Sequence, residues 1–518
     1  MASEATELKS HTLPSGKDAP SSEHEDIEFL EEGEGGSPSV SDMNASRLSQ
    51  AHREYLLNRH GTLELDPLPS ASDDDPYNWP TWKKITNLLL VAFHAFMSTF
   101  TASIIPAYHD ISVDFGVSIQ DASYLTSAQI AVLGVAPLFW KPLSKRYGRR
   151  PIFILSTVLC LVFNIGCAKS QSYASMMVCR AFAAWFISPA AAIGSAVVTE
   201  TFFKKDRGRY LGVWTLMVTL GVPVGPLIFG FVATRAGYRW IFWLLAIING
   251  VQCLLYILFP AETRYIPGNE ENSKSSSSIL SRHFRFRRID PTPLAIDEFY
   301  HPLALILCPT VSIPAFAYAM VFLFGSVLVT VEVPQLLQEK FALNEEQLGL
   351  QFLGVIIGTI LGEQVGGLLS DKWMNRRRAR KANGTKSEPE FRLWLAYPGV
   401  ILTIVGVIVF LVCTQQAPEG HWEIRPIIGI GIAAFGNQLV TTVLVTYAVD
   451  SYPLDSGSVG VCVTFVRQVW GFIGPFWFPA MFSNVGVAAS SGVAGALMFV
   501  FSFLLIIPVH VFGSRWRD

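Results

Sequence analysis

The sequence predicts an all-α polytopic membrane protein with twelve transmembrane helices in two six-helix bundles. Of its 518 residues, 51% are hydrophobic and only 15% are charged, whereas soluble proteins carry about 25% charged residues. Apolar stretches long enough to cross a hydrocarbon core of ~30 Å recur along the chain. The longest polar interruption divides these stretches into six and six. These observations exclude a soluble globular enzyme.

The first 80 residues are acidic and polar. Residues 1–80 hold 17 of the 41 Asp and Glu residues but only 5 of the 39 Lys and Arg residues. Such a segment buries too little apolar surface to offset the entropy lost on ordering. We therefore expect a disordered acidic cytosolic tail. Its start, MASEATELKS, lacks the basic and then apolar pattern of a signal peptide, so the first apolar helix is expected to direct membrane insertion.

Twelve apolar stretches follow the tail, separated by short polar breaks. Each is about 20 residues long or longer, which suits a membrane-spanning helix. The expected spans are 83–107, 121–141, 150–168, 173–197, 209–233, 239–260, 302–333, 347–370, 393–414, 424–449, 457–482 and 488–511.

A Ser-rich and then basic segment at residues 261–300 forms the expected cytosolic linker between bundles at 83–260 and 301–512. The two bundles resemble each other. PLSKRYGRR after the second helix is similar to LLSDKWMNRR after the eighth, and Gly225-Pro226 is echoed by Gly474-Pro475. A duplicated six-helix unit explains these echoes, and transporters built from such repeats bind substrate at the interface between the halves.

The distribution of Lys and Arg predicts the orientation. Beyond residue 80 the chain holds 34 basic and 24 acidic residues, and cytosolic loops of membrane proteins are enriched in basic residues. With both termini in the cytosol, the basic clusters fall inside the cell, where we expect contact with anionic membrane lipids and not nucleic acid. A plasma membrane location is favoured over a vacuolar one. The clusters lie at 141–150, 204–209, 264–288 and 371–381.

The sequence lacks the motifs of several enzyme classes. GxxxxGK, GxSxG and HExxH are absent, so neither a primary pump nor a hydrolase is indicated. The seven cysteines lie in apolar runs without CxxC spacing, which predicts neither disulfides nor a metal site, and no cofactor is expected. An HxxxxD string joins His109 to Asp114; this is the spacing of some membrane acyltransferases, but an ordinary polar loop is favoured.

Ionisable residues inside the spans are few and costly to bury, so they are the first candidates for function. Glu363 is the leading candidate for proton coupling, because a carboxyl at membrane depth can exchange a proton as its surroundings change. A permanent structural tie to a neighbour is the alternative. Arg180 and His94 are further candidates for coupling, although each can also serve packing or hydrogen bonding alone.

A second group of residues is expected to line a substrate cavity, because binding pockets place a few polar groups among apolar walls. Arg467, like Arg180, can bind an anionic substrate or alter the pKa of a nearby carboxyl, and an ion-pair role is the alternative for each. Packing inside the bundles is the alternative for all of them. The candidates are Arg467, Gln468, Asn437, Gln438, Trp214, Tyr318 and Glu332.

The fifth span carries a helix-packing motif. Gly221, Gly225 and Gly230 provide small residues on one ridge, and Pro226 favours a bend. Small residues let neighbouring helices approach closely. We expect this ridge to pack against another helix.

From about residue 83 to 512 the sequence resembles the major facilitator superfamily, and in particular its fungal twelve-helix drug:proton antiporter-like members. PLSKRYGRRPIF is similar to the loop motif between helices 2 and 3, and GVPVGPLIFG to the antiporter motif of helix 5. The resemblance implies proton coupling through Arg180 and gating through Asp371 with Arg149 and Arg150. Lys145 stands where the first-half motif normally has an acid, so only Asp371 keeps that charge.

Two shorter segments refine the resemblance. DDPYNWPTWKK before the first span is similar to fungal members, and HAFMSTFTASIIPA weakly resembles the histidinol and polyamine permease branch. The expected function is proton-coupled export of drugs or secondary metabolites by a monomeric transporter that is not an enzyme. Uptake of cationic nutrients such as polyamines is one alternative. The other is a membrane sensor that kept the fold without transporting.

Overall fold

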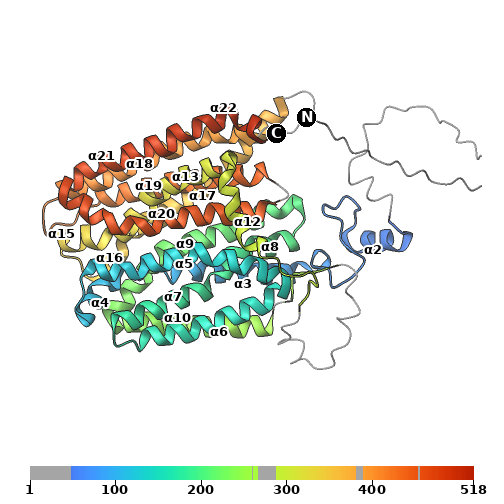
Figure 1. The fold of residues 1–518 in the computed structure, drawn as a ribbon, viewed down its shortest axis with the longest axis horizontal. Helices are drawn as coiled ribbons and strands as arrows, with labels where there is room; N and C mark the ends of the chain where they lie inside the picture. The colour runs from blue at the N-terminus through green and yellow to red at the C-terminus, as the bar shows by residue number, and fades with distance from the viewer. Residues whose placement is uncertain (1–47, 260, 267–287, 381–388, 453–454, 518) are drawn as a thin grey trace, which may run out of the picture.

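The computed structural model describes residues 48–259, 261–266, 288–380, 389–452 and 455–517, and every regular element in these ranges is helical. Figure 1 shows two layers of long, roughly parallel helices, with the early helices in one layer and the late helices in the other. The first and last described helices bring the two ends of the described chain to the same end of the bundle, which we call the terminal end. The other end is called the opposite end.

The first half begins at the terminal end and crosses the molecule six times. Ser118 starts the second long helix, because its side chain accepts the N–H of Asp121 while Asp121 bonds back to Ser118 in a capping box. The elements are α3 (Thr81–Phe100), η2 (Ile105–Ala107), α4 (Tyr108–Phe115), α5 (Ile119–Tyr147), α6 (Arg149–Ala168), α7 (Tyr173–Ile187), α8 (Pro189–Thr201), α9 (Lys204–Ala236) and α10 (Arg239–Leu258).

The second half also crosses six times, and its first crossing is divided by two π-helical segments, η5 and η6. A capping box at Asn344 and Gln347 starts the next crossing. The elements are α13 (Pro309–Phe322), η5 (Leu323–Leu328), α14 (Val329–Val331), η6 (Pro334–Gln338), α15 (Glu339–Phe341), α16 (Glu345–Gln351), α17 (Leu353–Arg380), η7 (Pro389–Leu395), α18 (Ala396–Gln416), α19 (Arg425–Ser451), α20 (Ser456–Val485), α21 (Val487–Met498), η9 (Phe499–Leu504) and α22 (Leu505–Arg517).

The structure confirms the predicted fold class, since the described residues contain twelve helical segments long and apolar enough to cross a membrane. Most boundaries differ by a few residues, and the start of the seventh span has a clear physical cause. The seventh span was expected from residue 302, but the membrane helix begins at Pro309. The backbone of Cys308 is extended, which interrupts the helical conformation there. Proline fits the first position of a helix because it needs no N–H partner. The preceding residues form the short helix α12 (Asp297–Ala304) instead.

Residues 48–80 were expected to belong to the disordered tail, and this expectation is wrong for them. They form α2 (Gln50–His60) and η1 (Pro76–Asn78). The Asn78 side chain donates to the carbonyls of Ser70 and Ser72, and the Tyr77 hydroxyl donates to the Thr199 carbonyl. These hydrogen bonds and the buried side chains of Leu56 and Trp79 hold the segment in place. Residues 1–47 lie outside the described part of the chain.

The linker helix α12 lies at the boundary between the halves at the terminal end (Figure 1). Arg146 of α5 is buried and donates to the Asp290 carboxylate at 3.0 Å and to Glu298. His301 of α12 lies 3.3 Å from Asp455, next to the start of α20. Hydrogen bonds from the Thr292 hydroxyl and backbone N–H lower the pKa of Asp290 to about 2. The linker therefore joins α5 to α20.

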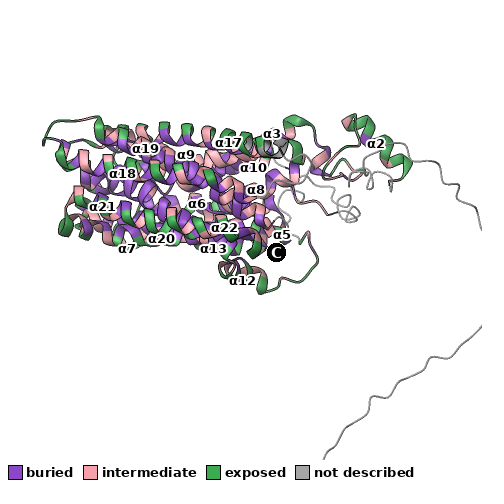
Figure 2. Ribbon diagram, turned by 90° about the horizontal axis from the view of Figure 1, so that it is seen from above, coloured by how far each residue is buried: buried purple, intermediate pink, exposed green. Residues whose placement is uncertain are grey.

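The halves meet along two seams. Helices α5 and α20 approach each other near both ends: Gln120 donates to the Pro475 carbonyl at the opposite end, and Lys141 donates to Ser458 at the terminal end. At the second seam, α9 meets α16 at the opposite end, where Thr234 lies 3.4 Å from Glu345. Figure 2 shows buried residues concentrated on the inner faces of the helices. The halves therefore contact each other at both ends along α5 and α20, and also at the opposite end between α9 and α16.

Candidate functional site

A polar cavity of about 90 Å³ lies between the two halves. The helices α3, α5 and α9 form its wall on one side, and α13, α17, α19 and α20 form it on the other. A drug-sized ligand needs several hundred Å³, so the cavity is contracted in this conformation. Its lining is Thr99, Ala102, Ser103, Ile105, Thr126, Ile130, Leu133, Val218, Thr219, Val222, Pro223, Tyr318, Phe322, Gly325, Ser326, Val327, Thr330, Val355, Thr359, Ala434, Asn437, Gln438, Arg467 and Gln468.

Arg467 of α20 is the charged member of this lining in the part of the chain that the structure describes. Its guanidinium lies over the rings of Phe322 and Tyr318, with 4.8 Å and 5.7 Å to the ring centroids. Nη1 donates to the Tyr318 hydroxyl at 3.0 Å, while the buried Nε has no hydrogen-bond partner. The aromatic rings and one hydroxyl hold the side chain in place, and a donor remains free.

Two amides add further polar atoms to the same wall. The Asn437 Oδ1 and Gln468 Oε1 atoms are buried and have no hydrogen-bond partner among the described residues. Five of the seven predicted cavity residues thus line the cavity: Tyr318, Asn437, Gln438, Arg467 and Gln468. Buried polar atoms without partners are rare in folded proteins. Their presence here fits a wall that a ligand completes.

Glu363 of α17 lies behind this wall and does not line it. Its Oε2 accepts a hydrogen bond from the Gln438 amide and a longer one, 3.3 Å, from the Thr442 hydroxyl. Gln438 itself lines the cavity. The carboxylate is therefore connected to the cavity wall through one side chain.

The other two predicted cavity residues lie elsewhere. Trp214 packs on α8, where its Nε1 donates to the Ala190 carbonyl at 3.3 Å and its ring covers Gly194. Glu332 lies at the break between α14 and η6, is fully buried, and both its carboxylate oxygens lack hydrogen-bond partners among the described residues. Neither residue lines the cavity in this conformation.

His94 and Arg180 are buried inside the first half. His94 lies between the Tyr256 hydroxyl, 3.3 Å from Nδ1, and the Ser156 hydroxyl, 3.2 Å from Nε2. Arg180 donates to the carbonyls of Thr101 and Ala102 at 2.9 Å and 3.3 Å. These carbonyls follow the end of α3, where a helix leaves acceptors without partners. Arg180 therefore supports the chain just behind the cavity, whose lining includes Ala102.

Arg149 and Arg150 start α6 within a carboxylate network at the terminal end. Arg149 pairs with Glu200 at 2.8 Å, while the backbone N–H groups of Arg149 and Arg150 donate to Glu262 at 2.8 Å and 3.0 Å. Burial raises the pKa of Glu262, although its backbone hydrogen bonds oppose the shift. Sequence reasoning missed both acids, which lie 50 or more residues away from their partners. The side chain of Asp371 lies outside the described residues.

The small-residue ridge of α9 contacts two different partners. Gly221 and Gly225 face the backbone of α3, where an added Cβ would lie 2.4 Å from the Phe96 carbonyl and 3.1 Å from the Phe100 carbonyl respectively. At Gly230 an added Cβ would lie 2.4 Å from the Glu345 carbonyl of α16. Pro226 lies inside α9, and its carbonyl faces Gly349. The ridge thus packs within the first half and also joins it to the second.

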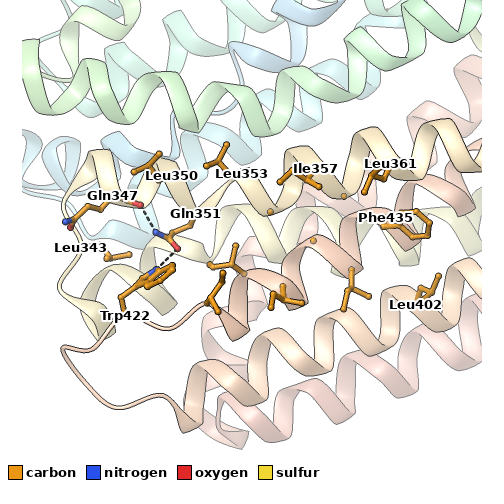
Figure 3. Close-up of a pocket in the computed structure, with 17 residues that line it drawn as sticks. Leu343, Gln347, Leu350, Gln351, Leu353, Ile357, Leu361, Leu402, Trp422 and Phe435 are labelled. Carbon is orange, nitrogen blue, oxygen red and sulfur yellow. Dashed lines mark hydrogen bonds between the residues drawn. The ribbon is translucent and has the colours of Figure 1, made fainter.

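A larger groove of about 900 Å³ lies outside the central cavity, on the outer surface of the second half between α17 and α19. Figure 3 shows leucine and isoleucine side chains along its walls and Trp422 at one end, hydrogen-bonded to Gln351. Leu361 and Ile428 are each 52% exposed. In a membrane-spanning protein such an exposed apolar face contacts lipid tails, and the groove offers few groups for recognition.

The described residues contain one group with the composition of a metal site. His109, Asp110 and Glu345 place one ligand atom each within 4.8 Å of one another at the opposite end. His109 is half-exposed, and exposed acidic groups are common without an ion. The HxxxxD string is not assembled either, because Asp114 bonds Tyr238 and Arg239 and not His109. In the described structure, Asp114 therefore links α4 to the start of α10 and does not form a pair with His109.

Twelve membrane-spanning segments in two six-helix halves around a polar cavity define a multi-pass membrane transporter. Residues 88–475 match the Major Facilitator Superfamily, and the chain belongs to that family. This membership classes it as a transporter and not an enzyme. The family predicted from the sequence motifs is therefore confirmed.

Fungal transporters are similar to this chain over most of its length. The MFS transporter cpaT of Aspergillus oryzae is 29% identical over 452 residues, which cover 85% of this chain and 89% of cpaT. The efflux pump radE of Floropilus chiversii is 26% identical over 484 residues, 88% of this chain and 87% of radE. The efflux pump FUBT of Fusarium oxysporum is 28% identical over 471 residues, 88% of this chain and 77% of FUBT.

Proposed function

We propose that the protein exports small organic molecules, such as drugs or secondary metabolites, by proton-coupled alternating access. The observation that carries this proposal is the polar cavity lined by both halves. Because the cavity is contracted and its wall keeps polar atoms without partners, substrate binding must separate the halves before it can occupy the site. Several similar fungal proteins are named efflux pumps, which favours export.

The orientation proposed for this function places the terminal end in the cytosol of a cell whose plasma membrane holds the protein. Basic residues support this orientation, because Lys145, Arg146, Arg149, Lys204 and Arg207 gather at the terminal end and cytosolic loops are enriched in such residues. The opposite end then faces outward.

Glu363 is the proposed proton-coupling residue. As a carboxylate, it holds the Gln438 amide by a charge-assisted hydrogen bond. A proton on the accepting oxygen removes this attraction and frees Gln438, whose side chain lines the cavity. Proton binding at Glu363 thereby changes the substrate site. A ligand moves a conformational equilibrium only through its different affinity for the two states, and this hydrogen bond supplies such a difference for the proton.

The test is transport by the full chain in liposomes with an imposed pH gradient. The probes are ethidium, fluorescein and coumarin, which are cationic, anionic and neutral. We expect gradient-driven flux of at least one probe, and we expect Glu363→Gln to make that flux independent of the gradient. Glu419→Gln is the matched control, because Glu419 is exposed in the connection between α18 and α19.

Two results contradict the proposal separately. Flux of no probe under any gradient would favour the non-transporting sensor. Flux that keeps its gradient dependence in Glu363→Gln would remove the coupling role of Glu363 and leave transport intact. Uptake of polyamines is not favoured, because the described lining of the cavity contains an arginine and no carboxylate.

A further inference from the structure

We infer that the central cavity binds organic anions, with Arg467 as the residue that receives the substrate's carboxylate or an equivalent acidic group. This inference rests on the proposed transport function and names its substrate class. It follows from the charge of the cavity wall, from the free donors of Arg467, and from the apolar surface beside them.

The described lining of the cavity carries a single charge. Arg467 is charged, and no described carboxylate lies within ion-pairing distance of it; the other lining residues of the described chain are neutral. A charge inside a membrane protein is costly unless it has a partner or faces water. The substrate is the partner that this cavity lacks, and an anion is the charge that stabilises the guanidinium.

The geometry of Arg467 favours a carboxylate over a point charge. Tyr318 takes one hydrogen bond from Nη1, and the buried Nε has no partner. The guanidinium presents its N–H groups in a planar fork, which matches the two oxygens of a carboxylate. The rings of Phe322 and Tyr318 lie 4.8 Å and 5.7 Å from the guanidinium. The hydrogen bond to Tyr318 uses only one of its N–H groups, so others remain for a ligand.

The surroundings favour an acid attached to an apolar or aromatic body. Ile130, Leu133 and Val355 provide apolar surface next to Phe322 in the same cavity. The amides of Asn437 and Gln468 carry oxygens without partners, and these accept hydrogen bonds from a hydroxyl or N–H of the substrate. A hydrophilic anion such as inorganic phosphate would leave the apolar wall without contacts.

The experiment compares three probes that share one ring system: naphthoate, its neutral amide naphthamide, and the cation naphthylmethylammonium. Binding to the purified full-length protein is measured in detergent, and gradient-driven flux is measured in liposomes. We expect naphthoate to bind at least about tenfold more tightly than either analogue, because a hydrogen bond to a charged group contributes more than a neutral one.

Arg467→Gln should lose at least about tenfold in naphthoate affinity and leave naphthamide binding unchanged. Arg467→Lys should recover part of the loss, since it keeps the charge without the fork. The matched control is Arg425→Gln, because Arg425 is exposed at the opposite end and pairs with Glu423 at 2.7 Å. Thermal unfolding of each variant separates loss of binding from loss of folding.

Two outcomes overturn the inference. One is wild-type binding in which naphthoate has no advantage over its analogues, including no binding of any probe. The other is unchanged naphthoate affinity in a folded Arg467→Gln protein. Gradient-driven flux of ethidium or coumarin without naphthoate binding would contradict the anion site and keep the proposed export. Naphthoate binding through Arg467 without flux would keep the site and contradict export.

Discussion

The outer groove is larger than the central cavity, but the cavity carries more polar groups. The groove measures about 900 Å³ and is lined mainly by aliphatic carbon, whereas the cavity measures about 90 Å³ and holds an arginine and three amides. The groove owes its shape to helix packing, because glycines of α17 let its backbone approach α19 closely. The cavity lies where the two halves meet. Position and chemistry therefore identify the transport site better than volume does.

The largest expected effect comes from filling the central cavity. Thr219→Trp places an indole in the cavity, and we expect it to lower transport by about 100-fold because misplaced contacts at a site cost that much. Thr219 bonds only carbonyls of its own helix, those of Thr215 and Leu216, so the fold should survive. Initial flux in liposomes is the measurement.

Leu361→Trp is the matched change in the groove, where the side chain is 52% exposed. It should change flux by no more than about twofold, as exposed substitutions usually do. Loss of flux in Leu361→Trp together with normal flux in Thr219→Trp would move the transport site to the groove and reverse the comparison.

An intermediate effect is expected where α17 contacts α19. A Cβ added at Gly358 would lie 2.2 Å from the Gly431 carbonyl, whereas a Cβ added at Gly367 would meet nothing within 4 Å. Gly358→Ala should therefore lower the free energy of unfolding by about 1–3 kcal/mol, and Gly367→Ala should leave it nearly unchanged. Thermal unfolding in detergent measures both. Equal stability of the two variants would show that close packing does not shape the groove.

The smallest effect is expected at the polar end of the groove. Trp422→Leu removes the hydrogen bond from the indole Nε1 to Gln351 Oε1, which is 3.0 Å long. Its loss should cost about 1 kcal/mol of stability and leave flux within about twofold of the wild type. A much larger fall in flux, with normal unfolding, would mean that the groove contributes to transport after all.

Hydropathy predicted the twelve spans because a membrane helix must be apolar along most of its length. It also pointed to cavity residues of the second half, because Arg467, Asn437 and Gln438 are polar residues within apolar helices. The first half lines the cavity with hydroxyls such as Thr99 and Thr219. The hydroxyl of threonine can donate to a carbonyl of its own helix, as that of Thr219 does. Threonine is therefore common in apolar helices, and these positions do not stand out in the sequence as cavity residues.

Two predicted cavity residues lie away from the cavity. Trp214 packs on α8, and Glu332 is buried outside the lining. A sequence shows that a polar group lies in a membrane helix, but the direction it faces depends on how the helices pack. The ordered residues 48–80 were missed because hydrogen bonds such as those of Asn78 hold them, and hydropathy does not record such bonds.

The position of Glu262 has a consequence for the order in which the protein is made. This residue directly follows the last crossing of the first half, and it accepts the N–H groups that begin α6. Synthesis runs from the amino end, so the two carboxylates that bind the start of α6, those of Glu200 and Glu262, are both present once the ribosome has passed Arg264. The early half can thus assemble as a unit while the later half is still being translated.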